Sequence, residues 1–249
     1  MKVAAYQAPL HATMSMDILP LIREQVTWCE SNGVEILCCP EGVLGGLADY
    51  VRRPAEIAID VESGQLQSIL EPLASNKVTT ILGFTETDRT GRLYNSAAVF
   101  HKGSILGIYR KLHTAINKSI YVPGNKMPIF TVGDLTFGIV ICLDSTYDEP
   151  AKVMVSQGAS ALFIPSNNGL PPAKGGPELV SISRKTDIAR AAQNQVSVIR
   201  ADVAGRNNGF VSFGSSRIVD ASGTVLQSAQ QLVADLIVAE IVPDRSTIQ

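Results

Sequence analysis

The segment "TFGIVICLDSTYDEP" (136–150) runs from apolar residues through a single cysteine directly into acidic and hydroxyl side chains. Its first part predicts a buried strand, so that Cys142 stands where the strand gives way to a polar loop. A thiol held at the end of a rigid element is well placed to act as a nucleophile. A lone cysteine is also commonly an ordinary buried side chain. The rest of the sequence is therefore needed to distinguish a nucleophile from a buried core residue.

Length and composition limit the classes of protein that fit. The chain has 249 residues, of which 45% are hydrophobic, and no linker-like stretch divides it, so we expect one α/β domain over residues 1–249. The net charge of −2 and a charged fraction of 18% provide no basic field for nucleic acid. No apolar run is long enough to span a membrane, and "MKVAAYQAP" (1–9) lacks the long apolar region and the cleavage site that are expected of a signal peptide. We therefore expect a cytoplasmic protein.

The other cysteines do not suggest a metal site or a disulfide framework. Cys38 and Cys39 are adjacent within an apolar run, Cys29 ends a helical pattern, and there is no C-x-x-C pair. The three histidines are scattered along the sequence. We expect these three cysteines to be reduced and buried, and we expect no metal and no cofactor.

Strand and helix signals alternate along the chain. Apolar spacing predicts helices at 18–29, 66–73, 150–157 and 178–194, the second distorted by Pro72. The predicted strands are 2–7, 34–40, 78–86, a hairpin over 95–111, the run before Cys142, 159–165, and two or three final strands.

The second half of the sequence resembles the first half. "GVEILCCPE" (33–41) aligns with "GASALFIPS" (158–166), and "SAAVFHKGSIL" (96–106) aligns with "SRIVDASGTVL" (216–226). By the same logic, the strand that ends at Gln7 corresponds to the strand that ends at Cys142. Three weak matches in the same order predict two pseudo-symmetric α-β-β halves, which would pack as a four-layer α-β-β-α sandwich.

The duplication predicts a cleft at the carboxyl ends of the core strands, with Glu41 facing Cys142. A thiol must lose its proton to attack, and both His113 and Glu41 could take it. On pattern alone, Glu41 is about as well explained as a strand-end group that caps backbone. Lys111 could stabilise anions in the cleft, although a lysine at a strand end is most often a solvated surface charge.

Three segments carry a family resemblance. "PEGVLGG" (40–46), "GIYRKLHT" (107–114) and "GIVICLDSTYDEP" (138–150) resemble the signature segments of the nitrilase superfamily of carbon–nitrogen hydrolases, in the same order. "GFTETDRTGRLYNSAAVF" (83–100), "ARAAQNQVSVI" (189–199) and "FGSSRIVDASGTVL" (213–226) also look like that family. The resemblance covers nearly the whole chain, and it implies the α-β-β-α sandwich.

The resemblance further implies an amidase-like enzyme with a Glu-Lys-Cys triad, here Glu41, Lys111 and Cys142. Glu41 would take the thiol proton, pass it to the departing amine and activate water against a thioester. The N–H of Leu143 would form the oxyanion hole with Lys111. The resemblance implies that Asp144 and Glu149 hold the loop. It also implies a homodimer through helix 150–157, which carries Val153 and Met154, and a segment near the C-terminus.

Some positions depart from the family pattern. Alignment on "YVPG" (121–124) places Asn117 where many members carry a second glutamate, and Asp148 replaces a usual proline. Members that act on carboxylated substrates often have arginine at the position of Thr146, and nitrile-hydrolysing members show Trp-Glu where Leu143-Asp144 stands. We therefore expect a small amide substrate rather than a carboxylated amide or a nitrile.

We expect contacts with the substrate from the loop that follows Cys142 and from the loop that follows the predicted strand 159–165. The expected supporting or substrate-binding residues are Asn117, Leu143, Thr146, Tyr147, Ser166 and Asn167, with Asn168 and Lys174 as further polar contacts. A nitrile or N-carbamoyl hydrolase remains an alternative, as does a non-catalytic binding protein of the same fold.

Overall fold

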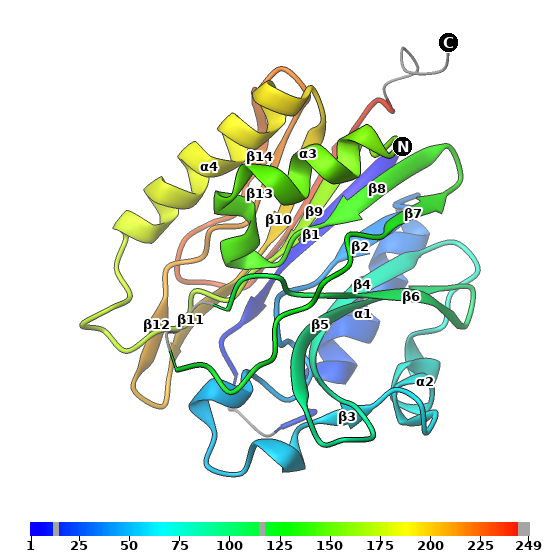
Figure 1. Ribbon diagram of the computed structural model, residues 1–249. Coiled ribbons are helices and arrows are strands. Elements are labelled where there is room, and N and C mark those ends of the chain that lie inside the picture. The colour runs from blue at the N-terminus through cyan, green and yellow to red at the C-terminus, as the bar shows by residue number, and fades with distance from the viewer. Residues whose placement is uncertain (12–14, 115–117, 244–249) are drawn as a thin grey trace.

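The computed structural model describes residues 1–11, 15–114 and 118–243. Over these residues the chain forms two β-sheets, of nine and six strands, which pack against each other and carry helices on their outer faces (Figure 1). The four layers follow the order helix, sheet, sheet, helix. The predicted α-β-β-α sandwich is confirmed.

The nine-stranded sheet has the order β12-β11-β1-β2-β4-β5-β6, with β15 paired to β1 and β3 paired to β4. Its strands are β1 (Lys2–Pro9), β2 (Ile36–Cys38), β3 (Ile59–Asp60), β4 (Thr79–Thr87), β5 (Leu93–His101), β6 (Ser104–Arg110), β11 (Val203–Asn207), β12 (Phe210–Ser212) and β15 (Asp235–Glu240).

The six-stranded sheet has the order β14-β13-β10-β9-β8-β7. Its strands are β7 (Ile129–Val132), β8 (Leu135–Ile139), β9 (Ala161–Pro165), β10 (Ser197–Ala201), β13 (Arg217–Val219) and β14 (Val225–Ser228).

The internal repeat is visible in the pairing of the strands. β1, β2 and β4 are parallel, and β5 and β6 continue the sheet antiparallel to them. In the other sheet β8, β9 and β10 are parallel, and β13 and β14 continue it in the same way. The matched segments 33–41 and 158–166 thus contain β2 and β9, and the matched hairpins contain β5–β6 and β13–β14. Both alignments made from the sequence are correct.

Helices α1 (Ile18–Ser31) and α2 (Gln65–Leu70) cover the first sheet, and α3 (Asp148–Ser156) and α4 (Glu178–Asn194) cover the second (Figure 1). α1 forms where apolar residues recur at helical spacing, and it buries Ile18, Ile22, Val26 and Cys29. Short 3-10 turns complete the connections: η1 (Ala48–Tyr50), η2 (Pro54–Glu56), η3 (Glu71–Leu73) and η4 (Cys142–Thr146).

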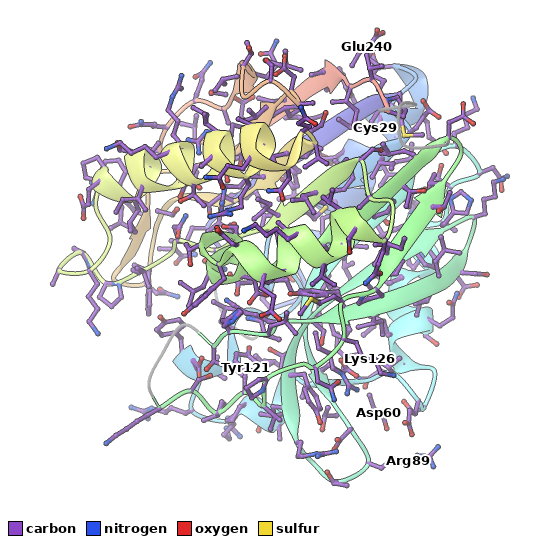
Figure 2. All side chains as sticks on the ribbon, turned by 45° about the horizontal axis from the view of Figure 1, so that its top comes forward. Cys29, Asp60, Arg89, Tyr121, Lys126 and Glu240 are labelled. Carbon is purple, nitrogen blue, oxygen red and sulfur yellow. The ribbon has the colours of Figure 1, made fainter. Side chains whose placement is uncertain are left out.

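The largest apolar cluster fills the space between the two sheets and continues beneath α3 and α4. Phe137 lies in it with its ring edge-on to Phe163, the centroids 5.0 Å apart. A second cluster joins the first sheet to α1 and α2. Charged side chains such as Arg89, Lys126 and Glu240 lie on the outside of the molecule (Figure 2).

Several details differ from the sequence predictions. Six strands rather than two or three follow α4, because β11, β12 and β15 extend the first sheet from the C-terminal half. The helix expected at 66–73 ends at Leu70 and continues as η3, which has Pro72 within it. β8 ends at Ile139, three residues before Cys142.

Met154 was expected at a dimer face of the helix after Cys142, and this placement is wrong. Its side chain is fully buried and lies against Gly138 of β8, where the glycine leaves room for it. Val153, on the same helix, is partly exposed. Among the described residues, no helix combines the length and the apolar character that crossing a membrane requires.

Candidate active site

Cys142 is held in an unusual backbone conformation. Val140 lies just beyond the end of β8, and its N–H still donates to the Phe163 C=O of β9 at 3.0 Å. Two residues later Cys142 has φ +47° and opens the turn η4. A residue with a Cβ in this left-handed region costs about 1–3 kcal/mol, and such strain is concentrated at functional sites. The Ser145 hydroxyl closes the turn by donating to the Cys142 C=O at 2.6 Å.

Glu41 lies in the turn that follows β2, and its carboxylate is fixed from two sides. Oε1 accepts hydrogen bonds from Lys111 Nζ at 2.6 Å and from Asn95 Nδ2 at 2.7 Å. The turn presses against β4 at Gly83, where an added Cβ would lie 2.5 Å from the Gly42 nitrogen. Only glycine at that position of β4 allows so close an approach.

Lys111 directly follows β6 and is only 4% exposed. Its N–H donates to the Asn95 C=O at 2.8 Å, so the residue is held by the strand next to β6. Burial disfavours the charged amine, but Glu41 and then Cys142 outweigh this effect and raise the Lys111 pKa above its ordinary value. The side chain therefore remains a cation at neutral pH.

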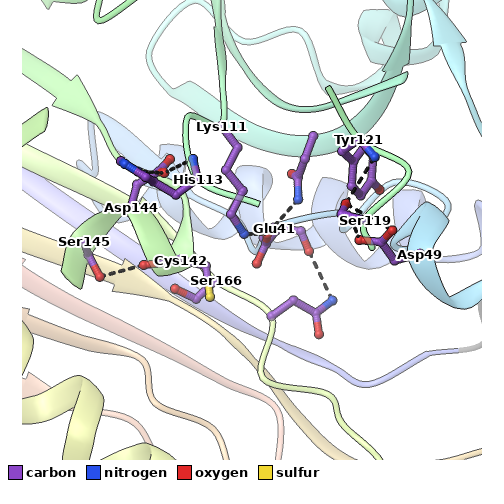
Figure 3. A network of polar contacts seen from close by, with 12 residues as sticks. Glu41, Asp49, Lys111, His113, Ser119, Tyr121, Cys142, Asp144, Ser145 and Ser166 are labelled. Atoms are coloured by element: carbon purple, nitrogen blue, oxygen red, sulfur yellow. Dashed lines mark hydrogen bonds and ion pairs between the residues drawn. The ribbon is translucent and has the colours of Figure 1, made fainter. Parts of the chain in front are cut away.

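Glu41, Lys111 and Cys142 line one cavity of about 370 Å³ and approach one another there (Figure 3). They come from both halves of the repeat, Glu41 and Lys111 from the first and Cys142 from the second. Burial, followed by the charge of Glu41, raises the pKa of the Cys142 thiol to about 11, although Lys111 and Arg200 act in the opposite direction. In the resting site the sulfur is therefore a thiol beside a carboxylate.

His113 is placed outside this cavity by a contact with Asp144. The Asp144 carboxylate is fully buried and accepts from the Tyr109 hydroxyl at 2.7 Å and from the His113 N–H at 2.7 Å. The imidazole Nδ1 lies 2.9 Å from the same carboxylate, and the ring stacks on Tyr147. Asp144 therefore anchors the loop after Cys142 to the segment after Lys111.

The other expected site residues fall into two groups. Leu143, Thr146, Asn167 and Asn168 line the cavity. Tyr147, Ser166 and Lys174 are not among its lining residues: Tyr147 is 45% exposed and covers His113, Ser166 is fully buried behind the cavity, and Lys174 is exposed. These three side chains therefore do not line the cavity. Asn117 lies outside the described residues.

Asn95 and Arg200 are two of the polar lining residues that were missed in the sequence. Asn95 begins "NSAAVF" (95–100), and it holds the Glu41 carboxylate. Arg200 lines the floor of the cavity within "VSVIRAD" (196–202), where a lone charge inside an apolar strand was a usable signal. No group of three or more potential metal ligands is gathered among the side chains that the structure describes.

The sequence as a whole matches a known family. A model of the carbon-nitrogen hydrolase family matches residues 2–248. A nitrilase from Pyrococcus abyssi is 30% identical over 224 residues, which cover 89% of this chain and 80% of that protein. An (R)-stereoselective amidase from Pseudomonas sp. is 28% identical over 201 residues, which cover 80% of this chain and 70% of that protein. The chain belongs to the carbon-nitrogen hydrolase family.

Solved structures show the same fold. An amidase from Nesterenkonia sp. AN1, in a form with acrylamide added to its active-site cysteine, superposes with a TM-score of 0.82. The match covers 98% of this chain and 94% of that chain at 22% identity. Nit3 of Saccharomyces cerevisiae, a nitrilase-superfamily member, superposes with a TM-score of 0.81 at 23% identity, covering 96% and 89% of the two chains.

The charges around the Cys142 sulfur allow the titration of its thiol to be predicted. We expect the Cys142 thiol to remain protonated well above pH 9, and we expect Glu41→Gln to lower its pKa, because an anion that raises this pKa is removed. The chemical shift of ¹³Cβ-labelled cysteine against pH measures both effects. Burial also raises the pKa of Cys29, to about 12, and Cys142→Ala identifies the resonance that belongs to Cys142. A wild-type thiol that titrates below pH 8, or a higher pKa in Glu41→Gln, would contradict this electrostatic picture.

Proposed function

We propose that the protein is an amidase in which Cys142 is the nucleophile, Glu41 the general base and Lys111 the cation that stabilises the oxyanion. One observation carries this proposal. Glu41 Oε1 is occupied by Lys111 and Asn95, whereas Oε2 has no hydrogen-bond partner within the described part of the chain. Glu41 is only 2% exposed and lines the cavity, so this oxygen is available there to accept the proton of the nearby thiol.

The proposed reaction proceeds in two halves. Glu41 takes the Cys142 proton while the sulfur attacks the amide carbon, and the C=O electron pair moves to the oxygen beside Lys111 and the Leu143 N–H. The C–N bond then breaks, and Glu41 returns the proton to the nitrogen, which leaves as ammonia or an amine. In the second half Glu41 deprotonates water as it attacks the thioester, and the sulfur leaves and regains its proton.

Two features support this assignment of roles. Cys142 opens η4, so the N–H of Leu143 is one of the first amides of a turn, which have no partner within that turn. The Nesterenkonia amidase also gives support, because its active-site cysteine adds acrylamide. His113 is committed to Asp144 and Tyr147 and is a poor alternative base.

Substitutions separate the two candidate bases. Cys142→Ala should abolish ammonia release, and Glu41→Gln should lower kcat by about two to four orders of magnitude because the general base is lost. His113→Ala should retain most of the activity, since that ring lies outside the cavity. Ammonia release from a panel of amides measures all three. Activity that survives in Cys142→Ala, or a dead His113→Ala with an active Glu41→Gln, would overturn the mechanism.

The cavity favours an uncharged substrate. Its two lining cations are both paired, Lys111 with Glu41 and Arg200 with Asp187 at 2.6 Å. The Thr146 hydroxyl donates to the Leu143 C=O at 2.8 Å and offers nothing like the bidentate clamp that fixes a carboxylate. Much of the remaining wall is apolar and comes from Leu47, Tyr50, Leu143, Leu170, Leu179 and Ile182. The lining carboxylate of Asp49 accepts a hydrogen bond from the Ser119 hydroxyl at 2.9 Å.

We propose that the substrate is a small uncharged amide with an aliphatic chain. Each buried methylene contributes ~0.8 kcal/mol, about a fourfold gain, so kcat/KM should rise from acetamide to butyramide. The same measurement should include the ω-carboxylated amide, the matching nitrile and an N-carbamoyl amine. If one of these three exceeds the aliphatic amide by tenfold, about 1.4 kcal/mol in transition-state preference, the substrate assignment is wrong.

We also propose a homodimer built through α3 and the segment near the C-terminus, a proposal that rests on the family resemblance. Val153 is an apolar side chain of α3 that remains partly exposed for such a contact. Sedimentation at micromolar concentration should show a dimer, and Val153→Glu should weaken it, whereas the distant, exposed Lys126→Glu should not. A wild-type monomer would refute the proposal.

A further inference from the structure

Arg200 is a buried charge in the middle of a buried strand. The residue lies in β10 and is 2% exposed, with apolar neighbours on either side in the sequence. A cation at such a position is costly to desolvate unless hydrogen bonds and an opposite charge compensate it. Arg200 also lines the floor of the cavity that holds Cys142, so its partners belong to the surroundings of the reacting sulfur.

Asp187 of α4 compensates the charge of Arg200. Arg200 Nε lies 3.0 and 2.9 Å from the two carboxylate oxygens, and Nη2 donates to Oδ1 at 2.6 Å. Arg217 Nη1 reaches the same carboxylate from β13 and donates to Oδ2 at 2.9 Å. Asp187 is therefore shared by two arginines, of which Arg200 lines the cavity.

The remaining guanidinium contacts lead to the two reacting residues. Arg200 Nη2 donates to the Ser145 hydroxyl at 2.9 Å, and Ser145 donates in turn to the Cys142 C=O at 2.6 Å. Arg200 Nη1 donates to the hydroxyl of Ser166. The Ser166 C=O accepts the backbone N–H of Glu41 at 3.2 Å. One guanidinium thus contacts the backbone of the nucleophile through one serine and the backbone of the base through another.

This arrangement suits the strained conformation at Cys142. The residue stays at φ +47° only where the surrounding structure holds it, and the Ser145–Cys142 hydrogen bond is part of that support. A planar fork of donors can reach Asp187 and both serines at once, whereas a lysine amine on a flexible stem cannot.

We propose that Arg200 is a positioning residue that sets the placement of Cys142 relative to Glu41 through Ser145 and Ser166 and adds a fixed positive charge behind the sulfur. This inference rests on the proposed function, since it assigns Arg200 to the reaction of Cys142. It does not require Arg200 to touch the substrate.

The charges around the sulfur determine the direction of its pH response. Burial and Glu41 raise the pKa of the thiol, and Lys111 and Arg200 lower it. Removal of Arg200 should therefore move the thiol pKa further upward. Other ionisable or charged groups lie around Cys142, Glu41, Lys111 and Arg200. They are Tyr50, Asp144, Asp187, Asp202 and Arg217.

Arg200→Met and Arg200→Lys test the proposal, with Arg217→Met as the matched control. Arg217 binds the same Asp187 carboxylate but donates to neither serine. In Arg200→Met we expect kcat to fall about a hundredfold, the cost of a small misplacement, with little change in KM. The pH profile of Cys142 alkylation by iodoacetamide should move to higher pH.

The two other variants separate charge from geometry. Arg200→Lys should keep the wild-type alkylation profile, because it keeps the charge, while kcat recovers only in part. Arg217→Met should lose thermal stability but keep the wild-type kcat and profile. The proposal would be overturned if Arg200→Met kept the wild-type kcat and the wild-type pH profile of alkylation. It would also be overturned if Arg217→Met showed the same fall in kcat and the same shift of the alkylation profile as Arg200→Met.

A fourth variant covers the case in which Arg200→Met does not fold. Ser145→Ala leaves the Arg200–Asp187 pair intact and removes the link to the Cys142 C=O, so kcat should fall at an unchanged alkylation pKa. A wild-type kcat in Ser145→Ala would contradict the proposed link. The alkylation profiles need no substrate, so failure of the amidase assignment would appear separately, as a wild-type protein that turns over no amide.

Discussion

The buried ion pair between Lys111 and Glu41 is the contact on which the site depends. Each group alone would be a largely buried charge without a compensating partner, and breaking a buried pair of this kind typically costs about 3–5 kcal/mol. Joined at 2.6 Å, with Asn95 as a further donor, they hold Glu41 in one orientation. The same pair acts on Cys142: burial and then the Glu41 carboxylate raise the pKa of the thiol, and Lys111 lowers it, with the result that the resting sulfur stays protonated.

The internal duplication explains how these groups meet. β2 and β9 are equivalent strands, and the residues that follow them, Glu41 and Ser166, are joined by a backbone hydrogen bond. The two halves therefore touch at matching positions, and their strand ends form a common cavity. The halves have diverged in chemistry: the first supplies a carboxylate and an amine, and the second supplies the thiol and the buried arginine behind it.

The fold and the three central residues could be predicted from the sequence, whereas the contacts that support these three residues could not. Apolar periodicity predicted the strands because it is a local pattern, and the repeat predicted that the strands form two equivalent sheets. The signature segments indicated Glu41, Lys111 and Cys142. Tyr147 was misplaced because its ring stacks on His113, which comes from a distant segment. Arg200 was missed because its partners Asp187, Ser145 and Ser166 come together only in the folded chain.

The most direct test of the proposed mechanism is detection of the acyl group on Cys142. Rapid acid quench of the enzyme during turnover of a slow amide, followed by intact-mass measurement and peptide mapping, reports whether a thioester forms. The mechanism predicts that the mass of the acyl group appears on the peptide that contains Cys142 and disappears as the substrate is exhausted. Ammonia release from enzyme that carries no acyl group at any time, or an acyl group on a different residue, would contradict it.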